Sequence, residues 1–589
     1  MVKMENGSYQ IYDGKVIIRQ HGKLCDHPDE LLSSKLFLVI LKQYIQDLKA
    51  HDSKLLGIFE DAAISDGDIR TLVKTLAFLT KLPADLVPRV QEGSAQFFRD
   101  KDLLHDFVEQ FYNYWRRLHR LVICDTYEDQ VDVRPYRTFN ETVEALMHTV
   151  RSTYRDIQEK VTGNHPRIYR QVSAGAEIGA IALPMDIPYP SALYQKLNHI
   201  ALIRQVLIYP PMIFNSPMNK RKGMFEQVQK NPLEGVNPDP KDWVCYPAKV
   251  GPLLIMIYFS IHVFELGFSL CNLFELADEE DLKHKPDAVF LFGVMDAPNL
   301  NPGGSETVFY EDAENDMLVG VVPGKDEFGY FGYLKKMVLT LHNIRMMKSG
   351  RLPFHGAMVR ITVQNKRPTT FLIMGDTGAG KSETLEALRS IGKNELKDLI
   401  TIADDMGSLN FDQQGRVLGY GTEMGAFVRL DDLASGYALG QIDRTIIMNP
   451  DEVNARVVLP VTDYKEVIKG YPVDFILYAN NYEEVDEAHP SIQRFTSPEE
   501  ALPVFREGKV MSKGTTTSTG LVRSYFANIF GPAQYQAMHE ELAQRYFNKF
   551  FENHLYVGQL RTRLGIPGKE RLGPEEAAKQ LLCIINDLS

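Results

Sequence analysis

The chain has 589 residues, of which 44% are hydrophobic, 24% charged and 10% aromatic, and its formal net charge is −12. This composition is typical of a globular protein, and the length favours two or three domains. The acidic balance argues against a broad nucleic-acid-binding surface, which needs excess Lys and Arg, but it allows a small basic pocket for phosphates.

The N-terminus and the cysteines indicate the compartment. Residues 1–7 are polar and lack the apolar core of a signal peptide. The five cysteines lie far apart and form no Cys-x-x-Cys pair. This pattern fits reduced thiols. We therefore expect a cytoplasmic protein.

Residues 1–165 are predicted to be a mostly helical region, whose role no motif reveals. Between Leu103 and Leu118, apolar side chains recur at spacings of three and four residues, as on one face of a helix. We interpret this stripe as core. It consists of Leu104, Phe107, Phe111, Tyr114 and Leu118.

Residues 166–325 are predicted to form an α/β lobe on the substrate side. The apolar runs 290–294 and 317–322 are typical of buried strands. The segment 253–273 is apolar enough to resemble a membrane span, but it contains His262, Glu265 and Asn272. Ionisable groups are costly in hydrocarbon, so we interpret this segment as buried core.

Residues 326–589 are predicted to form an α/β nucleotide-binding domain with a mixed sheet. Short apolar runs at 371–374, 399–403 and 475–479 alternate with segments of helical character. Such alternation is typical of α/β folds.

A phosphate-binding loop follows the first of these strands. Residues 375–382 match Gly-x-x-x-x-Gly-Lys-Ser and precede the helix-forming segment 383–389. Glycines let backbone N–H groups surround phosphate oxygens at the positive end of a helix. Lys381 is expected to bridge the β and γ phosphates, and the Ser382 hydroxyl to reach a divalent metal. The predicted nucleotide-binding residues here are Gly375, Asp376, Thr377, Gly378, Ala379, Gly380, Lys381 and Ser382.

Two carboxylates follow the strand predicted at 399–403. Asp404 and Asp405 stand where a Walker-B-type metal ligand is found beside a phosphate loop. The alternative is a solvated Asp-Asp turn.

Four segments, in this order, resemble phosphoenolpyruvate carboxykinase, and its ATP-dependent branch most closely. They are residues 330–337, which contain Lys335 and Lys336, residues 354–357, the phosphate loop and residues 403–405. The resemblance spans about 317–570 and implies a carboxykinase-like P-loop fold. It also implies a catalytic manganese held by Lys336, His355 and Asp405, and a nucleotide-bound magnesium served by Asp404 and Ser382. A lysine ligates a metal only as the neutral amine, so burial and neighbouring charge must lower its pKa.

Downstream segments extend the resemblance. Residues 422–429 resemble the family's Phe-Glu-Gly-Gly-Cys-Tyr-Ala-Lys, which gives Glu423 a place in the nucleotide site and sets Arg429 where the family has a phosphate-contacting lysine. Residues 454–460 resemble the segment whose arginine, here Arg456, contacts the transferred phosphate. A mobile lid is expected at 512–520. The implied catalytic residues are Lys335, Lys336, Lys381, Arg429 and Arg456.

The leading hypothesis is therefore a carboxykinase-like enzyme. It would use Mn²⁺, Mg²⁺ and ATP to convert oxaloacetate into phosphoenolpyruvate and carbon dioxide. Its partners would be a nucleotide and a small carboxylate, with neither nucleic acid nor membrane. The family's carboxylate-binding segment, Arg-Ser-Pro-Lys-Asp, has no counterpart here.

Two alternatives remain open. The Asp-Thr-Gly of the loop and the trailing Glu383 are closer to HPr kinase/phosphorylase. An HPr-kinase-like protein or metabolite kinase, with residues 1–165 recruiting the acceptor, is the first alternative. A non-catalytic nucleotide sensor is the second.

Overall fold

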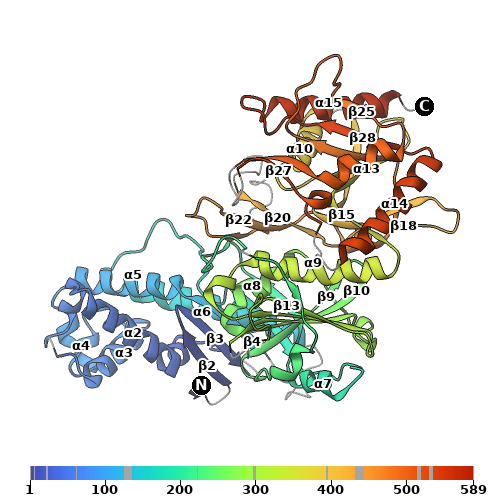
Figure 1. The fold of residues 1–589 in the computed structure, drawn as a ribbon. Coiled ribbons are helices and arrows are strands. Elements are labelled where there is room, and N and C mark those ends of the chain that lie inside the picture. The colour runs from blue at the N-terminus through green and yellow to red at the C-terminus, as the bar shows by residue number, and fades with distance from the viewer. Residues whose placement is uncertain are drawn as a thin grey trace. The chain divides into compact units, whose positions relative to one another are not determined.

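The computed structural model is mixed α/β, and Figure 1 shows its helices and strands. Contacts divide the chain into two compact units. The N-terminal unit comprises Met1–Pro184 and Ala201–Pro210, and the C-terminal unit comprises Met185–Ile200 and Pro211–Ser589. The residues that the structure describes are 2–4, 7–20, 24–61, 63–124, 135–221, 223–295, 300–392, 395–430, 443–513, 519–529 and 535–587.

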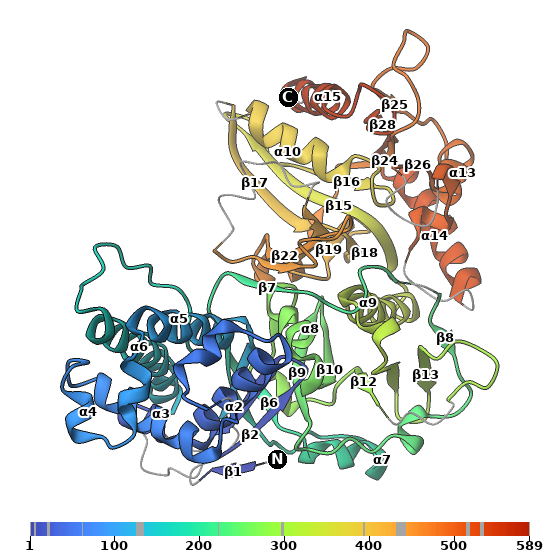
Figure 2. The ribbon, with the colours of Figure 1, turned by 90° about the vertical axis from the view of Figure 1, so that its left-hand side faces the viewer.

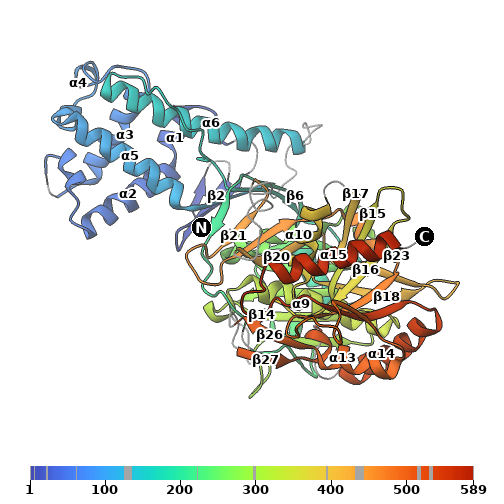
Figure 3. The ribbon, with the colours of Figure 1, turned by 90° about the horizontal axis from the view of Figure 1, so that it is seen from above.

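Helices make up most of the N-terminal unit (Figure 3). The predicted helix is α5. Leu104 and Phe107 of its stripe are fully buried among the side chains of the neighbouring helices, and Phe111 and Tyr114 pack against this core while partly exposed. Capping at its start comes from Asp100, whose side chain accepts from Leu103 N. The helices are α1 (Pro28–Ser33), α2 (Lys35–Ala50), α3 (Asp66–Leu79), α4 (Val87–Val90), α5 (Lys101–Arg117) and α6 (Pro135–Thr162), with 3-10 turns η1 (Lys54–Ile58) and η2 (Ser94–Phe98).

The N-terminal unit also contains a sheet, whose strands within residues 1–165 the sequence did not indicate. Its order is β1-β2-β3-β4-β5-β6, with parallel pairing of β3 with β4 and of β4 with β5. A second core, which includes Val16, Val122 and Val143, lies beneath it. The strands are β1 (Val2–Met4), β2 (Gly7–Tyr12), β3 (Lys15–Gln20), β4 (His119–Cys124), β5 (Ile178–Leu183) and β6 (Leu202–Ile208).

The first sheet of the C-terminal unit contains the two predicted strands of the 166–325 segment, β12 and β14. The segment 253–273 forms the buried strand β10 followed by short helical turns and α8 (Phe264–Phe268), in agreement with the interpretation as core. Across the described residues, no helix has the length and apolar character needed to span a membrane. The strand order is β9 (Trp243–Val250), β10 (Leu253–Ser260), β12 (Ala288–Val294), β14 (Met317–Pro323), β13 (Val308–Asp312) and β8 (Glu226–Gln227), with β11 (Glu275–Leu276) on β9.

The second sheet of this unit contains the other three predicted strands, β16, β17 and β24. Helices α10 (Lys381–Ile391) and α15 (Leu572–Asp587) pack side by side against it, as Figure 2 shows. The order is β23 (Tyr471–Pro472), β19 (Val417–Gly421), β18 (Met406–Phe411), β15 (Leu352–Val363), β16 (Thr369–Met374), β24 (Phe475–Asn480), β28 (Tyr556–Arg561) and β25 (Ile492–Arg494), with β17 (Leu396–Ala403) on β15.

Helix α9 (Phe331–Lys348) contacts strands of both sheets, among them β14 and β15. Nearly all of its residues are buried, which explains why its apolar residues are not confined to one face. Of the two lysines that α9 carries, Lys335 is buried, and Lys336 retains partial exposure.

Smaller elements complete the C-terminal unit. A four-stranded sheet has the order β20 (Gly425–Arg429), β22 (Arg456–Pro460), β21 (Ile446–Met448) and β7 (Met212–Phe214), and β26 (Lys509–Lys513) pairs with β27 (Thr519–Arg523). The remaining helices are α7 (Ala192–Gln195), α12 (Tyr464–Ile468), α13 (Pro498–Glu507) and α14 (Gln536–Glu552).

Candidate active site

Strand pairing brings three of the predicted site segments together. Strand β15 pairs with β16 along one edge and with β17 and β18 along the other. At the end of these strands, Gly375 N donates to His355 O at 3.1 Å, and Gly356 N donates to Asp405 O at 2.9 Å. The phosphate loop, the histidine and the Asp-Asp pair are therefore neighbours in space.

The phosphate loop leads from β16 into α10, and its glycines are needed for its shape. Gly378 and Gly380 have φ angles of 79° and 92°, in the left-handed region that favours glycine. A Cβ on Gly380 would also lie 2.5 Å from Thr562 Oγ1. The buried Lys381 amine donates to Gly375 O at 2.7 Å and to Asp376 O at 3.0 Å, whereas Ser382 is exposed in the first turn of α10.

Three residues that the sequence did not indicate support this loop. Thr562 Oγ1 donates to Ala379 O at 2.7 Å, and Asn481 Nδ2 donates to Gly378 O at 2.9 Å. Ser524 Oγ donates to Asp376 Oδ2 at 3.1 Å. Each lies more than 100 residues from its partner, so no local pattern could reveal it.

His355 is held from both sides of its ring. Its Nδ1 contacts the carbonyl oxygen of Ala527, and because a carbonyl only accepts, Nδ1 must carry a proton. Its Nε2 lies 2.8 Å from Asp405 Oδ1. In a neutral ring with Nδ1 protonated, Nε2 is a lone pair facing a carboxylate oxygen. A proton or a cation must therefore lie between these two atoms.

The Ala527 carbonyl belongs to a backbone turn of unusual conformation. Phe526, Ala527 and Asn528 have φ angles of 45°, 56° and 62°. Left-handed conformations are unfavourable for residues with a Cβ, so surrounding contacts must maintain this turn. The contact with His355 is one of them.

The two adjacent lysines have different surroundings. Lys335 Nζ lies 2.8 Å from Asp405 Oδ2 and 3.2 Å from Glu423 Oε1. Burial acts to lower the pKa of Lys335, but these two carboxylates outweigh burial and raise it, so Lys335 is an ammonium. For Lys336, burial lowers the pKa to about 8, and the nearby Arg221 guanidinium acts in the same direction. The carboxylates of Asp405 and Asp376 oppose this shift, which places the Lys336 amine within their electrostatic reach.

The acidic side chains are also differentiated. Burial would raise the pKa of Asp405, but Lys335 and His355 hold it well below its usual range. Burial and the charge of Asp405 raise the pKa of Asp404, against the opposing charge of Lys335 and Lys381. Burial raises the pKa of Glu423 to about 7, and its Oε2 accepts from Thr422 Oγ1 at 2.9 Å.

A group of arginines lies beside this cluster. Arg429 and Arg456 are directly opposite each other on β20 and β22, so their side chains share one face of that pair. Arg456 lies over the Phe427 ring at 5.5 Å, and its buried Nε has no hydrogen-bond partner among the described residues. Burial raises the pKa of the Tyr330 hydroxyl, and the positive charges of Arg456, Lys335 and Arg221 partly offset this rise.

The donor set fits a divalent metal in part. Among the residues that the structure describes, no group of three or more His, Cys, Asp and Glu side chains is arranged to hold a metal. His355 and Asp405 nevertheless present two ligand atoms 2.8 Å apart, and adjacent ligands of an octahedral ion with bonds of about 2.1 Å lie about 3 Å apart. The amine of Lys336 is the predicted third ligand. Imidazole, carboxylate and amine together suit manganese better than magnesium.

The expected lid at 512–520 falls largely outside the described part of the chain, since 514–518 are not described.

No protein-family model matches this chain, and no curated protein matches it significantly.

Proposed function

We propose that this chain is a phosphoenolpyruvate carboxykinase-like enzyme, which decarboxylates oxaloacetate and transfers the γ-phosphoryl group of a nucleoside triphosphate to the resulting enolate. The observation that supports this best is the contact of His355 with Asp405 beside the phosphate loop, with the Lys336 amine within electrostatic reach. A histidine, an aspartate and an amine of lowered pKa are the ligand types that the sequence resemblance implies.

In this proposal, the phosphate loop binds and orients the nucleotide. Lys381 exchanges its bonds to the Gly375 and Asp376 carbonyls for bonds to phosphate oxygens, so its charge is already in place. The N-terminus of α10 adds partial positive charge. Asp404, whose pKa is raised by burial and partly lowered again by the charge of Lys381, would bind the nucleotide-bound Mg²⁺ either directly or through a water molecule.

The substrate would lie against His355, Asp405 and Lys336. A metal held there supplies Lewis acidity toward substrate oxygens. The C–C bond to the departing carboxylate breaks, and its electrons form the enolate. The enolate oxygen then bonds to the γ-phosphorus as the bond to the leaving nucleoside diphosphate breaks. The Arg456 Nε–H, which has no hydrogen-bond partner among the described residues, is suited to donate to a phosphoryl oxygen during this transfer.

Arg221 is the candidate for the substrate carboxylate, which the sequence left unassigned. Its guanidinium is partly buried over the Phe225 ring at 5.2 Å, and burial lowers its pKa. It is also the charged neighbour with the largest effect on Lys336. A carboxylate bound by Arg221 would thus lie next to the proposed metal ligand.

An HPr-kinase-like protein or metabolite kinase is the second candidate. It is favoured by one observation: Asp405 is paired with Lys335, which is an ammonium and so cannot ligate a metal. A kinase would need the phosphate loop, Asp404 and Asp405, but no amine ligand.

Turnover separates the two candidates. Purified protein with Mn²⁺, Mg²⁺, ATP and oxaloacetate should yield phosphoenolpyruvate and carbon dioxide in equal amounts. The carboxykinase proposal is falsified if ATP, GTP and pyrophosphate all fail as phosphoryl donors. Label from γ-³²P-ATP on a hydroxyl acceptor, with no loss of oxaloacetate, would identify a kinase instead.

A further inference from the structure

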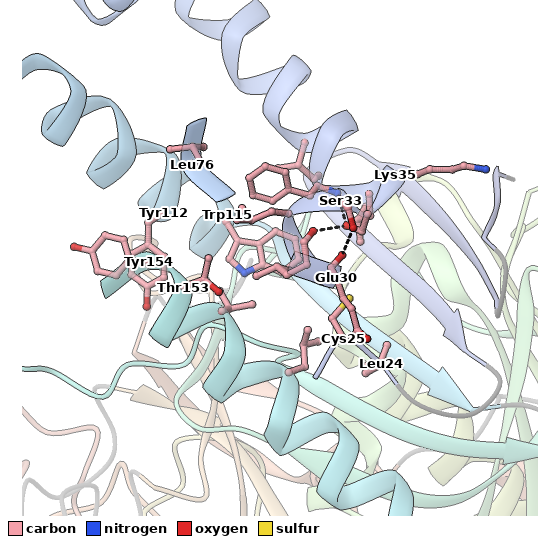
Figure 4. Close-up of a pocket in the computed structure, with 18 of the residues that line it drawn as sticks. Leu24, Cys25, Glu30, Ser33, Lys35, Leu76, Tyr112, Trp115, Thr153 and Tyr154 are labelled. Carbon is pink, nitrogen blue, oxygen red and sulfur yellow. Dashed lines mark hydrogen bonds between the residues drawn. The ribbon is translucent and has the colours of Figure 1, made fainter. Parts of the chain in front are cut away.

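The N-terminal unit contains a cavity of about 620 Å³ between β3 and the helices α1, α2, α5 and α6. Figure 4 shows its lining side chains, and all of them come from residues 18–157. Their identity makes the walls mainly apolar and aromatic. Small-molecule sites typically have volumes of about 300–1,000 Å³, so the cavity has the size of a ligand site. Representative wall residues are Ile40, Phe111, Trp115, Leu146, Val150 and Tyr154.

One polar group in this wall lacks a partner. Thr153 is only 4% exposed and lines the cavity, and its hydroxyl has no hydrogen-bond partner among the residues described. A helical threonine commonly donates to the carbonyl three or four residues earlier. A buried hydroxyl without a partner is unfavourable, and a ligand with a hydrogen-bonding group would relieve this.

The aromatic side chains around Thr153 are fixed by contacts of their own. Tyr112 and Tyr154 stack with their ring centroids 3.9 Å apart, and the Tyr154 hydroxyl donates to Glu109. Trp115 Nε1 donates to Ala174 O at 2.6 Å. The polar atoms of Tyr154 and Trp115 are thus already bonded within the protein, whereas the Thr153 hydroxyl is not.

The charges at the cavity determine the kind of ligand. The carboxylates of Asp26 and Glu30 are among the lining groups, and Glu30 Oε2 accepts from Asp26 N at 2.9 Å. Lys35 is the basic residue of the lining, and Figure 4 shows its side chain extending away from the other lining residues. The cavity thus disfavours an anionic head group.

We propose that this cavity binds a largely apolar small molecule whose single polar head group is uncharged or positively charged and forms a hydrogen bond with Thr153. The proposal does not depend on the proposed function, because none of the lining residues belongs to the nucleotide site.

Three molecules with the same twelve-carbon chain test the head group: dodecanol, dodecylamine and dodecanoate. Each is titrated against the full chain in competition with the fluorescent neutral probe N-phenyl-1-naphthylamine. We expect the probe to bind once per chain, and dodecanol and dodecylamine to displace it at concentrations at least tenfold lower than dodecanoate. If dodecanoate displaces the probe at the same concentration as dodecanol and dodecylamine, the proposed preference for an uncharged or positive head group is wrong. If neither the probe, dodecanol nor dodecylamine shows saturable binding, the cavity is not a ligand site.

Two variants locate the binding. Val150→Trp fills the cavity and should weaken probe binding at least tenfold. Thr153→Val removes the hydroxyl at constant volume and should weaken dodecanol binding about 3- to 10-fold. Val453→Trp, at an 89% exposed position in the C-terminal unit, is the control and should change neither. If Val150→Trp does not fold, Thr153→Val decides: unchanged dodecanol affinity overturns the proposal.

Discussion

Nε2 of His355 lies 2.8 Å from Oδ1 of Asp405, while the opposite nitrogen of the same ring contacts the Ala527 carbonyl. The second contact requires a proton on Nδ1, so Nε2 faces the carboxylate either through a proton of its own or through a bound cation. Lys335 binds the other oxygen of Asp405. The chemistry of the site depends on what bridges His355 and Asp405, and the following predictions test the groups around them.

Replacing Lys336 by Met removes the amine and keeps much of the apolar side chain. If the proposed manganese site exists, Mn²⁺ affinity should fall at least about 10-fold, and phosphoenolpyruvate formation about 100-fold, because that site would lose one of its three proposed protein ligands. Electron paramagnetic resonance titration and a coupled assay measure these changes. Lys325→Met removes an exposed lysine paired with Glu306 and should affect neither. Unaltered Mn²⁺ affinity in Lys336→Met would favour the kinase alternative.

Replacing Lys381 by Ala removes the cation of the phosphate loop. Charge-assisted hydrogen bonds contribute about 1.5–3 kcal/mol, so ATP affinity should fall about 10- to 100-fold in calorimetric titrations. The exposed Lys397 on β17 provides the control, since Lys397→Ala should bind ATP as the parent chain does. Equal affinities for all three proteins would show that ATP binds elsewhere.

Replacing Lys335 by Met leaves the Asp405 and Glu423 carboxylates without their shared cation. Breaking a buried ion pair costs about 3–5 kcal/mol, and denaturant unfolding should detect this loss in the free energy of unfolding. The double variant Lys335→Met, Glu423→Gln should recover part of it. Lys465→Met, in an exposed pair with Asp463, should have no measurable effect. A double variant no more stable than Lys335→Met would contradict the assigned pairing of Lys335 with Glu423.

Two buried histidines should make the protein sensitive to acid. Burial lowers the pKa of His342 and of His539 to about 4, from about 6.5 in the unfolded chain. Below pH 6.5 the unfolded chain binds a proton at each histidine and the folded chain does not, so the free energy of unfolding decreases. By pH 4 this decrease is about 3 kcal/mol for each histidine, and above pH 6.5 it is absent. The free energy of unfolding, measured at pH 7 and pH 4.5, should fall less in His342→Leu than in the parent chain. An identical fall in both would exclude His342 as a source.

Replacing Ala527 by Gly should stabilise the left-handed turn that holds His355. Glycine adopts the φ of 56° without steric cost, so we expect the free energy of unfolding to rise by about 1 kcal/mol. Ala501→Gly in helix α13 provides the opposite case, because glycine lowers stability inside a helix. Destabilisation by Ala527→Gly would show that the turn is not strained.

Parts of the site were predictable because their signals are local. The phosphate loop, its flanking strand and helix, and the Asp404-Asp405 pair follow from glycine conformation, strand composition and helix-forming residues within about 35 residues. The contacts of Thr562, Asn481 and Ala527 were not predictable, because their partners are 183, 103 and 172 residues away in the sequence.

The sequence by itself determined the strand, glycine-containing loop and helix around residues 375–382, the other four apolar strands and the order of the charged segments, since each depends on neighbouring residues. It did not reveal α9, because a helix buried on all sides has no amphipathic period. Only the tertiary structure decided which of the two adjacent lysines contacts Asp405. Consecutive residues on a helix point about 100° apart, so packing of α9 between two sheets turned Lys335 toward Asp405 and Glu423 and left Lys336 beside Arg221.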